Sequence, residues 1–418
     1  MKRVAVVGSG ISGIAAADAL SRRHVVTLIE ADARLGGHTD THTIEMDGRR
    51  HRVDSGFIVF NELNYPGFSE WLRELGVPSQ PSDMSFGVSS RSVGFEYGTR
   101  DARALFADPL NLLRPRFFRM LRDLLRFYRG ARDMAAGDAD LTLGEYLDRN
   151  GFGEAFVSGH LVPMCAALWS TPVVAARDIP IDHVVRFMAR HRMLELAGRP
   201  EWRVVAGGSG TYLDAFTRRF RGEVLTATAV RSVLRSARDV RLVLDSGERS
   251  FDAVFLACHS DQALALLDRP TPNERAVLGA LRYRPNRVVV HSDTRVMPRR
   301  KAAWSSWNVV QVPGTDRCTV TYWMNRLQSI ESGRPLLVTV EPAIELDPTL
   351  VHVERAYAHP VFDRAAIEAQ RAKLDIDGTY ATYYCGAYWG AGFHEDGFQS
   401  ARTAVAAFDA RMETERAA

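Results

Sequence analysis

The chain has 418 residues, 46% of them hydrophobic, and a formal net charge of +3 at pH 7. This length predicts two or three domains with sizeable apolar cores, and the nearly balanced charge argues against a protein that binds nucleic acid. Four scattered cysteines without metal-type spacing predict no metal site and favour a reduced, cytoplasmic chain. No stretch approaches the roughly 20 apolar residues that span a bilayer, so only peripheral membrane contact is expected.

Apolar patterning divides the chain into a βαβ start, a helical middle and a strand-rich remainder. Residues 3–7, 11–22 and 25–29 predict strand, helix and strand, which together form one βαβ unit. From about residue 61 to residue 203 the pattern is mainly helical, and helices are predicted at 112–134, 143–148 and 183–196. Later strands are predicted at 223–226, 230–234, 240–244, 253–257, 288–291, 319–324, 336–340 and 351–357, before a final helix at 397–410.

Three glycines lie between the first strand and the first helix. Gly8 permits a tight turn, Gly10 lets the backbone approach a pyrophosphate, and Gly13 allows close packing of helix on strand. Glu30 ends the second strand about 20 residues on, where a carboxylate can bind a ribose diol. The phosphates are expected at the N-terminus of the helix. The predicted phosphate-binding segment is Gly8, Ser9, Gly10, Ile11, Ser12 and Gly13.

The residues after Glu30 point to a particular dinucleotide. Ala31, Arg34, Gly36, Gly37 and His38 follow it. This segment resembles the extended motif of the flavin-containing amine oxidoreductase superfamily, in which the ribose-binding acid precedes an arginine and a Gly-Gly pair bearing a second arginine. The resemblance implies FAD as the cofactor. His38 replaces that second arginine, and its imidazole can still donate a hydrogen bond to the pyrophosphate.

Two glycine-containing segments extend the resemblance. Ser55, Gly56 and Phe57 resemble the family's strand that passes under the flavin. Residues 207–213 resemble its Gly-Gly segment before a helix. Both segments imply backbone that approaches the cofactor or packs closely beside it.

The C-terminal half contributes further cofactor contacts by the same analogy. Val230 is expected to touch the adenine through its backbone, and Cys258 to end a strand that returns to the cofactor. Asp396, Gly397 and Phe398 stand in the place of the last flavin-binding motif. A helix begins there, and its amides can stabilise negative charge on the reduced ring.

The resemblance implies an amine oxidase-like α/β flavoprotein of two domains. A Rossmann-type FAD-binding domain is expected from three segments, residues 1–62, 203–280 and 378–418. An α+β substrate domain, with a helical insert and an antiparallel sheet, is expected from residues 63–202 and 281–377.

Two departures from the family disfavour amine oxidation. Amine-oxidising members usually place a lysine beside flavin N5, on the strand that corresponds to residues 285–291, where Asn286 or Arg287 stands here. Their aromatic cage also takes a tyrosine from the last motif, where this chain has Phe393 and His394. An amine oxidase therefore remains an alternative rather than the first interpretation.

The whole chain is more similar to a bacterial branch of predicted NAD/FAD-binding proteins, commonly encoded beside cyclopropane-fatty-acid-type methyltransferases. The resemblance implies desaturation of a methylated, unsaturated, phospholipid-linked fatty acyl chain by hydride transfer to flavin N5, as in furan fatty acid synthesis, with a lipid methyltransferase as partner. A carotenoid or polyprenyl desaturase and a flavin-bearing scaffold for the methyltransferase remain alternatives. The segments that carry this similarity are residues 36–38, 56–61, 81–86, 304–308, 321–325, 359–362 and 392–397.

Several side chains are candidates for the proton-accepting base. His394 and Glu395 belong to the last flavin-binding motif, and histidine exchanges protons near neutral pH, although both can equally serve to hydrogen-bond the loop. Tyr322, Asn325 and His359 are weaker candidates from the substrate domain. An aromatic set is expected either to line an apolar tunnel or to form ordinary core: Trp304, Trp307, Tyr322 and Trp323.

Residues 114–132 are predicted to form a basic amphipathic helix. Apolar residues such as Phe117 and Leu121 recur at helical spacing, while Arg122, Arg126 and Arg129 project toward other faces. Such a helix packs its apolar face on its own domain or lies on anionic lipid. The second alternative predicts peripheral contact with the inner face of the cytoplasmic membrane.

Overall fold

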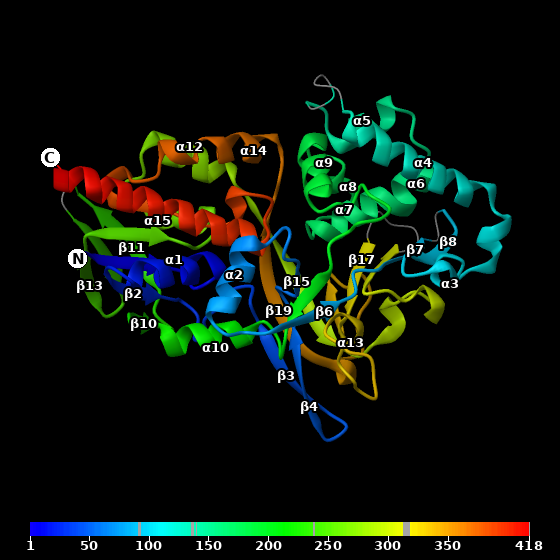
Figure 1. Ribbon diagram of the computed structural model, residues 1–418, viewed down its shortest axis with the longest axis horizontal. Coiled ribbons are helices and arrows are strands. Elements are labelled where there is room, and N and C mark those ends of the chain that lie inside the picture. Colours follow the sequence, from blue (N-terminus) through cyan, green and yellow to red (C-terminus); the bar gives the residue numbers. More distant parts are fainter. Residues whose placement is uncertain (91–92, 135–137, 139, 237–238, 312–317, 418) are drawn as a thin grey trace.

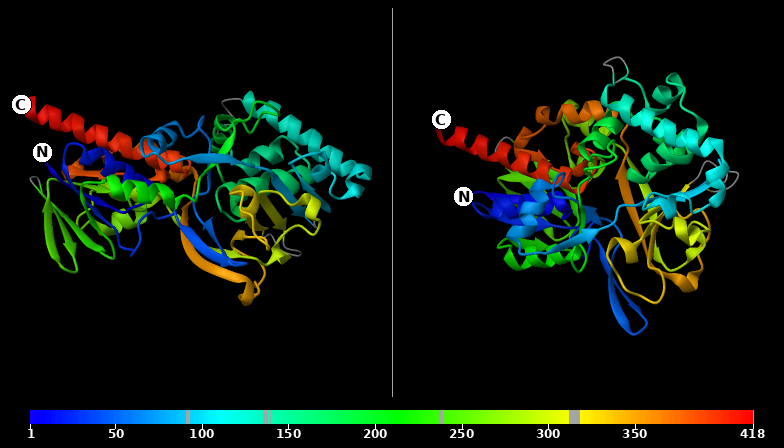
Figure 2. Two further views of the ribbon diagram at one scale, coloured as in Figure 1. Left: turned by 60° about the horizontal axis from the view of Figure 1, so that its bottom comes forward. Right: turned by 45° about the vertical axis from the view of Figure 1, so that its right-hand side comes forward.

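The computed structural model describes residues 1–90, 93–134, 138, 140–236, 239–311 and 318–417. The chain forms two lobes, with a parallel sheet and the two chain ends in one lobe and a second sheet with a layer of helices in the other (Figure 1). The long strands β15 (Tyr283–His291) and β19 (Val351–Pro360) lie between them. The other views show the same division (Figure 2).

The first lobe is built on a five-stranded parallel sheet in the order β10-β2-β1-β14-β20. The central strands read as continuous apolar runs because both faces of the sheet are covered; Val4, Ala5 and Val6 are fully buried. The strands come from three separate parts of the chain, which confirms the predicted Rossmann-type domain built from three segments. They are β1 (Arg3–Val7), β2 (Val25–Ile29), β10 (Glu223–Leu225), β14 (Ala253–Leu256) and β20 (Thr382–Tyr384).

Helices α1 (Ile11–Ser21) and α15 (His394–Ala417) pack together on this sheet in one apolar core. Helix α2 (Pro66–Glu74) contributes Phe68 and Trp71 to the same core, although it lies beyond the expected boundary at residue 62. Other elements of this lobe are α10 (Gly210–Arg219), α11 (Ser260–Leu266), α12 (Pro272–Ala280), β11 (Val230–Arg235), β12 (Val240–Leu244) and β13 (Gly247–Phe251).

The second lobe contains a seven-stranded sheet in the order β19-β15-β18-β17-β16-β7-β8. Its neighbours are antiparallel except β16 and β7, which run parallel. The region from residue 61 to 203 is mainly helical, as expected, but the short strands β7 and β8, which were not predicted, interrupt it. The signal is weak because β7 and β8, which pair with each other, have only five and four residues and contain Gly and Ser. The remaining strands are β7 (Phe86–Ser90), β8 (Phe95–Gly98), β16 (Trp307–Gln311), β17 (Cys318–Trp323) and β18 (Leu337–Val340).

A helical layer covers one side of this second sheet, and its helices share a core with β7, β8 and β16. Helix α4 (Pro115–Arg132) buries Phe117, Met120 and Phe127 there. No helix in the described ranges has the length and apolar character needed to cross a membrane. The other α-helices of the second lobe are α3 (Ala102–Leu105), α5 (Leu143–Arg149), α6 (Glu154–Phe156), α7 (Val162–Leu168), α8 (Val173–Ala176), α9 (Ile181–Arg190) and α13 (Met324–Leu327).

Short elements connect the lobes. The hairpin β3 (Thr41–Met46) and β4 (Arg49–Asp54) projects beside the long strands. A small sheet joins β5 (Val59–Phe60), β9 (Trp202–Val205) and β6 (Ser79–Ser82). Helix α14 (Arg364–Arg371) follows β19 and precedes the return of the chain to the parallel sheet.

Candidate cofactor and active site

Between β1 and the first turn of α1, a side chain would clash at Gly8 and Gly13, whereas there is free space at Gly10. Gly8 has φ +98°, and a Cβ at Gly13 would lie 1.8 Å from the Gly8 carbonyl oxygen. A Cβ at Gly10 would meet no atom within 4 Å. No side chain caps the N-terminus of α1 among the described residues, so its first amides are available to an external acceptor. This arrangement fits a pyrophosphate.

The second glycine pair lies directly on this turn. The Gly36 amide donates to the carbonyl and hydroxyl oxygens of Ser9, both at 3.1 Å. A Cβ at Gly37 would lie 3.3 Å from Gly10 Cα. The Glu30 carboxylate accepts hydrogen bonds from the Ser9 amide at 2.8 Å and hydroxyl at 2.5 Å. The two predicted motifs therefore form one surface at the carboxyl ends of β1 and β2, where open α/β sheets bind their ligands.

Arg34 holds the shape of this loop. Its guanidinium donates to the carbonyl oxygens of Gly37 at 2.8 Å and Thr39 at 3.1 Å. It also forms an ion pair with Asp40 at 3.2 Å. A direct contact between Arg34 and the cofactor stays a prediction, whereas its support of the loop backbone is visible in these bonds.

The segment after β4 closes against the same loop. The Phe57 amide donates to the His38 carbonyl oxygen at 2.8 Å, and a Cβ at Gly56 would lie 2.0 Å from that oxygen. Ser55 Oγ lies 2.8 Å from His42 Nε2 and 2.6 Å from Tyr357 Oη. Glycine at position 56 is therefore required by packing against this loop.

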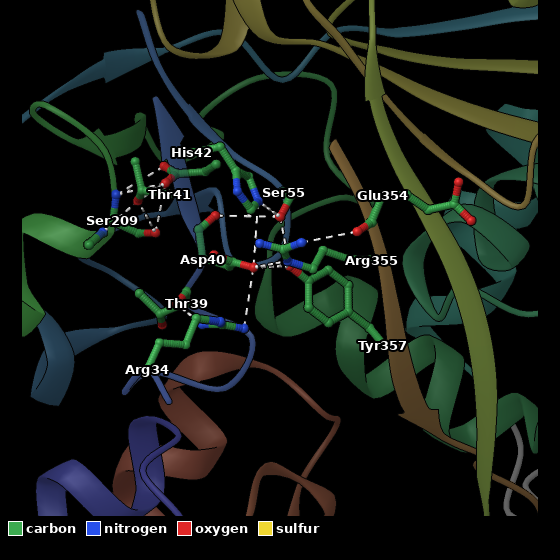
Figure 3. Close-up of polar contacts among 12 residues, drawn as sticks. Arg34, Thr39, Asp40, Thr41, His42, Ser55, Ser209, Glu354, Arg355 and Tyr357 are labelled. Atoms are coloured by element: carbon green, nitrogen blue, oxygen red, sulfur yellow. Dashed lines mark hydrogen bonds and ion pairs between the residues drawn. The ribbon is translucent and has the colours of Figure 1, made fainter. Parts of the chain in front are cut away.

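Asp40 ties this cofactor loop to the second lobe (Figure 3). Its carboxylate accepts hydrogen bonds from Arg355 Nε at 2.9 Å and from Tyr357 Oη at 3.0 Å, both on β19. Because Asp40 is 5% exposed, its charge is stabilised by these donors and by Arg34 rather than by water. The loop and the long strand β19 are thus held in a fixed relation.

The predicted contacts from the later segments converge on the same edge. A Cβ at Gly8 would lie 3.0 Å from the Cys258 amide, which follows β14. A Cβ at Gly397 would lie 2.8 Å from atoms of Ile11 and Ser12. The N-termini of α15 and α1 therefore meet, and their positive ends favour bound negative charge. Burial raises the pKa of the Cys258 thiol to about 12, so this thiol is protonated at neutral pH.

Val230 and Ala31 lie at the other end of the predicted cofactor path. Val230 begins β11, two residues after Thr228, whose amide donates to the Glu30 carbonyl oxygen at 2.9 Å. Ala31 follows Glu30 and is exposed. An adenine contact by Val230 stays a prediction, and this backbone bond places β11 beside the expected ribose site.

Three imidazoles from distant segments gather beside the cofactor loop. We call His38, His259 and His359 the histidine layer. The ring centroid of His38 lies 5.3 Å from that of His359 and 6.1 Å from that of His259. Asn286 Nδ2 on β15 lies 2.8 Å from His359 Nδ1, a hydrogen bond that orients the ring. Sequence patterns missed this grouping, although the position of His259 directly after Cys258 was a usable signal.

The histidine layer is uncharged at neutral pH. Burial lowers the pKa of His359 to about 4, and burial together with the neighbouring imidazoles lowers the pKa of His38 well below its ordinary value. His38 Nε2 is buried without a hydrogen-bond partner in the described part of the chain. An orphaned polar atom beside a pyrophosphate-shaped turn fits contact with a bound cofactor.

His394 and Glu395, the two foremost candidates for the base, both make contacts within the protein. His394 Nε2 lies 2.9 Å from Tyr212 Oη, its ring stacks on Phe57 at 3.5 Å, and burial lowers its pKa to about 3. The Glu395 carboxylate accepts hydrogen bonds from the amides of Gly67 and Phe68 at the start of α2, at 3.0 and 2.9 Å. These contacts give both side chains positioning roles, and a catalytic role for either stays a prediction.

The weaker candidates lie in the second lobe. Asn325 Oδ1 accepts hydrogen bonds from the Leu336 amide at 2.7 Å and from Trp323 Nε1 at 3.1 Å, which fixes the loop after β17. Tyr322 packs edge-on against Trp307 at 5.0 Å, and burial raises its pKa. Trp304 is buried and donates to the Pro298 carbonyl oxygen at 2.7 Å. These contacts are those of core residues, and a catalytic role for Tyr322 or Asn325 stays a prediction.

Comparison with known protein families shows to which family the chain belongs. The family described as flavin containing amine oxidoreductase matches residues 11–326. The chain belongs to this family. Its cofactor is FAD. The glycine turn, the second glycine pair and the start of α15 converge at one edge of the parallel sheet, and FAD binding at this edge stays a prediction.

Solved structures of this flavoprotein family share the fold over the whole chain. Cyclohexylamine oxidase from Brevibacterium oxydans superposes with a TM-score of 0.72 at 16% identity, covering 99% of each chain. A fatty acid isomerase from P. acnes superposes with a TM-score of 0.69 at 15% identity, covering 97% of this chain and 98% of the other. At such identity the likeness shows the fold alone.

Curated relatives of this flavoprotein match only over short segments. Carotenoid phi-ring synthase of Chlorobaculum tepidum is 37% identical over 79 residues, which is 19% of this chain and 12% of the relative. A second match covers 13% of its relative. These matches are too short to transfer an activity.

Proposed function

We propose that this FAD-dependent oxidoreductase desaturates a methylated, unsaturated fatty acyl chain carried on a phospholipid, as in furan fatty acid synthesis. The observation that carries the proposal is the uncharged wall formed by the histidine layer and Asn286. Asn286 stands on the strand where amine-oxidising relatives usually place a lysine. Neutral rings suit an apolar chain, because no charge must lose its water when the chain binds.

The chemistry divides between cofactor and protein. Bound FAD supplies the acceptor for a hydride that leaves an allylic carbon of the acyl chain. A neutral imidazole of the histidine layer accepts the proton from the neighbouring carbon, and the electron pair of that C–H bond forms the new double bond. The chain must hold the two carbons in register with these acceptors and keep water out.

The similar proteins include both kinds and do not decide between a lipid and an amine, so the preference for a lipid rests on the uncharged wall. One structural neighbour is described as a fatty acid isomerase, and one curated relative as a carotenoid phi-ring synthase. Cyclohexylamine oxidase shares the same fold, so amine oxidation is the second outcome to be tested.

Analysis of products from the purified holoenzyme tests the proposal. Incubation in air with a phospholipid bearing a methylated unsaturated chain is expected to give a lipid lighter by two hydrogen atoms, with the ultraviolet absorption of a conjugated diene. Diamine and carotenoid precursors serve as parallel substrates. Turnover of an amine or carotenoid, with the lipid unchanged, would contradict the proposal.

We also propose that α4 and the turn before it dock on anionic lipid. Although α4 buries one face, large apolar side chains remain exposed: Leu112 at 54%, Leu113 at 79%, Phe118 at 45% and Leu125 at 37%. Arg119, Arg122, Arg126 and Arg129 are exposed along the same helix. Apolar side chains among arginines suit an anionic surface, at about 1 kcal/mol for each arginine near it.

Sedimentation with vesicles that contain anionic phospholipid measures this docking. Replacement of Arg122, Arg126 and Arg129 by glutamate is expected to abolish binding. The matched control replaces three exposed arginines of the other lobe, Arg218, Arg269 and Arg275, by glutamate as well. Equal binding by both triple variants, or no binding by the wild type, would overturn the docking proposal.

The expected lipid methyltransferase is likewise proposed as the partner that supplies the methylated chain. Co-purification of the two proteins from cells that express both, against an unrelated methyltransferase as control, tests this association. Recovery of the two methyltransferases in equal amounts would contradict it.

A further inference from the structure

We propose that the cavity between α9, α14 and the start of α15 binds the anionic head of the lipid substrate. Its volume is about 520 Å³, within the range of roughly 300–1,000 Å³ of small-molecule sites. The class of ligand rests on the proposed function, whereas the binding itself can be measured without turnover. The head is either the carboxylate of a free fatty acid or the phosphate of a phospholipid, since guanidinium groups recognise both.

The charged groups of the cavity leave guanidinium available to an external anion. Arg186, Arg190 and Arg371 line it. Arg186 forms an ion pair with Asp182 one turn earlier, and Arg190 Nη1 lies 3.8 Å from Asp396 Oδ1. In the ranges that the structure describes, no ion pair of Arg371 is found. Three guanidinium groups from two helices therefore face one space.

The two carboxylates that line the cavity are already bonded to backbone amides. Glu395 accepts from the start of α2, as described above. Asp396 Oδ2 accepts hydrogen bonds from the amides of Ala391 at 3.1 Å and Phe393 at 3.0 Å. Because these bonds occupy the carboxylates, the cavity is better suited to an anion than to an ammonium group.

An apolar wall continues from the cationic rim. Phe187 stacks on Phe393 with centroids 4.6 Å apart and on His191 at 4.0 Å, and Ile367 lines the opposite helix. Phe393 directly precedes α15, whose first turn lies against α1. The cavity therefore combines a charged rim with aromatic side chains, and it borders the last cofactor motif.

Two lining side chains carry buried polar atoms without partners in the described chain. Asn64 Oδ1 and His183 Nε2 belong to residues that are 4% and 8% exposed. Such orphaned atoms are rare in folded proteins and mark positions where a bound group or water completes the hydrogen bonding. His183 can donate to an anionic oxygen, and Asn64 can accept from a water bound with it.

Calorimetric titration of the holoenzyme tests the site. Oleate and oleoyl lysophosphatidate are the anionic probes, and oleyl alcohol and oleylamine carry the same chain with a neutral or cationic head. We expect at least one anionic probe to bind tenfold or more tightly than both others, and the stronger anion identifies the head. Equal affinity for the alcohol, or tighter binding of the amine, would overturn the proposal.

Paired variants locate the binding. Arg371→Met and Arg186→Met are each expected to weaken binding of the anion about tenfold. Arg269→Met, an arginine with a 94% exposed side chain in the other lobe, is the matched control. Unchanged affinity in both cavity variants, with bound FAD retained, would place the anion elsewhere. Tight anion binding by an enzyme that fails to desaturate lipid would contradict the proposed function and leave this site standing.

Discussion

The two lobes contribute different kinds of atoms to the candidate site. In the parallel-sheet lobe the cofactor surface is backbone, and the positions that would carry a Cβ are filled by other main-chain atoms at Gly13 and Gly56. The other lobe contributes side chains to the site, Asn286, Tyr357 and His359. A backbone surface suits a cofactor that a whole family shares, whereas side chains can be exchanged to suit a substrate without altering the fold.

Replacing the tightest glycine should have the largest effect. Gly13→Ala places a Cβ 1.8 Å from the Gly8 carbonyl oxygen, so α1 must move away from β1 and the protein should be isolated without flavin absorbance. Gly10→Ala is the matched control for folding, since its Cβ meets open space. It should keep its melting temperature while losing FAD affinity. A flavin-loaded Gly13→Ala protein would show that the turn is not fixed by sterics.

A change in the histidine layer should instead affect rate and leave the cofactor bound. His359→Gln can keep the hydrogen bond to Asn286 but cannot accept a proton at neutral pH. We expect substrate-dependent flavin reduction to slow by roughly 10²- to 10⁴-fold, the usual contribution of a general base. Stopped-flow measurement at full FAD occupancy tests this expectation. An unchanged rate in His359→Gln and in His259→Gln would remove the histidine layer from proton transfer.

Ion pairs in the two lobes should differ sharply in their effect on stability. Arg235 and Glu274 are paired with side chains 3% and 0% exposed, and Glu274 also accepts from Tyr384 Oη at 2.6 Å. Glu274→Gln should lower the free energy of unfolding by about 3–5 kcal/mol, because it leaves a buried guanidinium uncompensated. The exposed pair Arg287 and Glu354 is the control, and Glu354→Gln should change urea unfolding little. Equal losses would refute the burial argument.

Replacing Asp54 by asparagine should have the smallest effect on the free energy of unfolding, and this effect should depend on pH. Burial raises its pKa from 3.8 to about 6, against the hydrogen bonds that it accepts from Thr41 and Ser209. The folded chain binds this proton more tightly than the unfolded chain, so this contribution to stability falls as pH rises from about 4 to about 6. The difference in unfolding free energy between wild type and Asp54→Asn should shift by roughly 2–3 kcal/mol across that window. A pH-independent difference would contradict this account.

The backbone half of the site was predictable because its signals are local. Gly8, Gly10 and Gly13 lie within one turn, and the sequence order of strand, glycine turn and helix fixes what they do. The side-chain half depends on contacts across long separations. Asn286 and His359 lie 73 residues apart, and Asp40 and Tyr357 lie 317 residues apart. No pattern within a single segment reports such pairs.

Two strands were missed in the fold, and the catalytic role of the candidate base Glu395 stays a prediction. Strands β7 and β8 were missed because they have only five and four residues and contain Gly and Ser, so that neither shows a clear alternating pattern. Glu395 was a candidate base because of its place in a motif, and its bonds to the start of α2 depend on a helix more than 300 residues earlier. Strands as short as β1 and β14 were found because burial on both faces leaves a continuous apolar run.

Anaerobic mixing of the holoenzyme with substrate tests the central claim most directly. We expect the uncharged wall formed by the histidine layer and Asn286 to select an unsaturated acyl chain. The visible absorption of oxidised flavin is followed after addition of a phospholipid with a methylated unsaturated chain, its saturated counterpart, or a diamine. The account predicts rapid bleaching by the unsaturated lipid and none by the other two. Bleaching by the diamine, with neither lipid active, would contradict it.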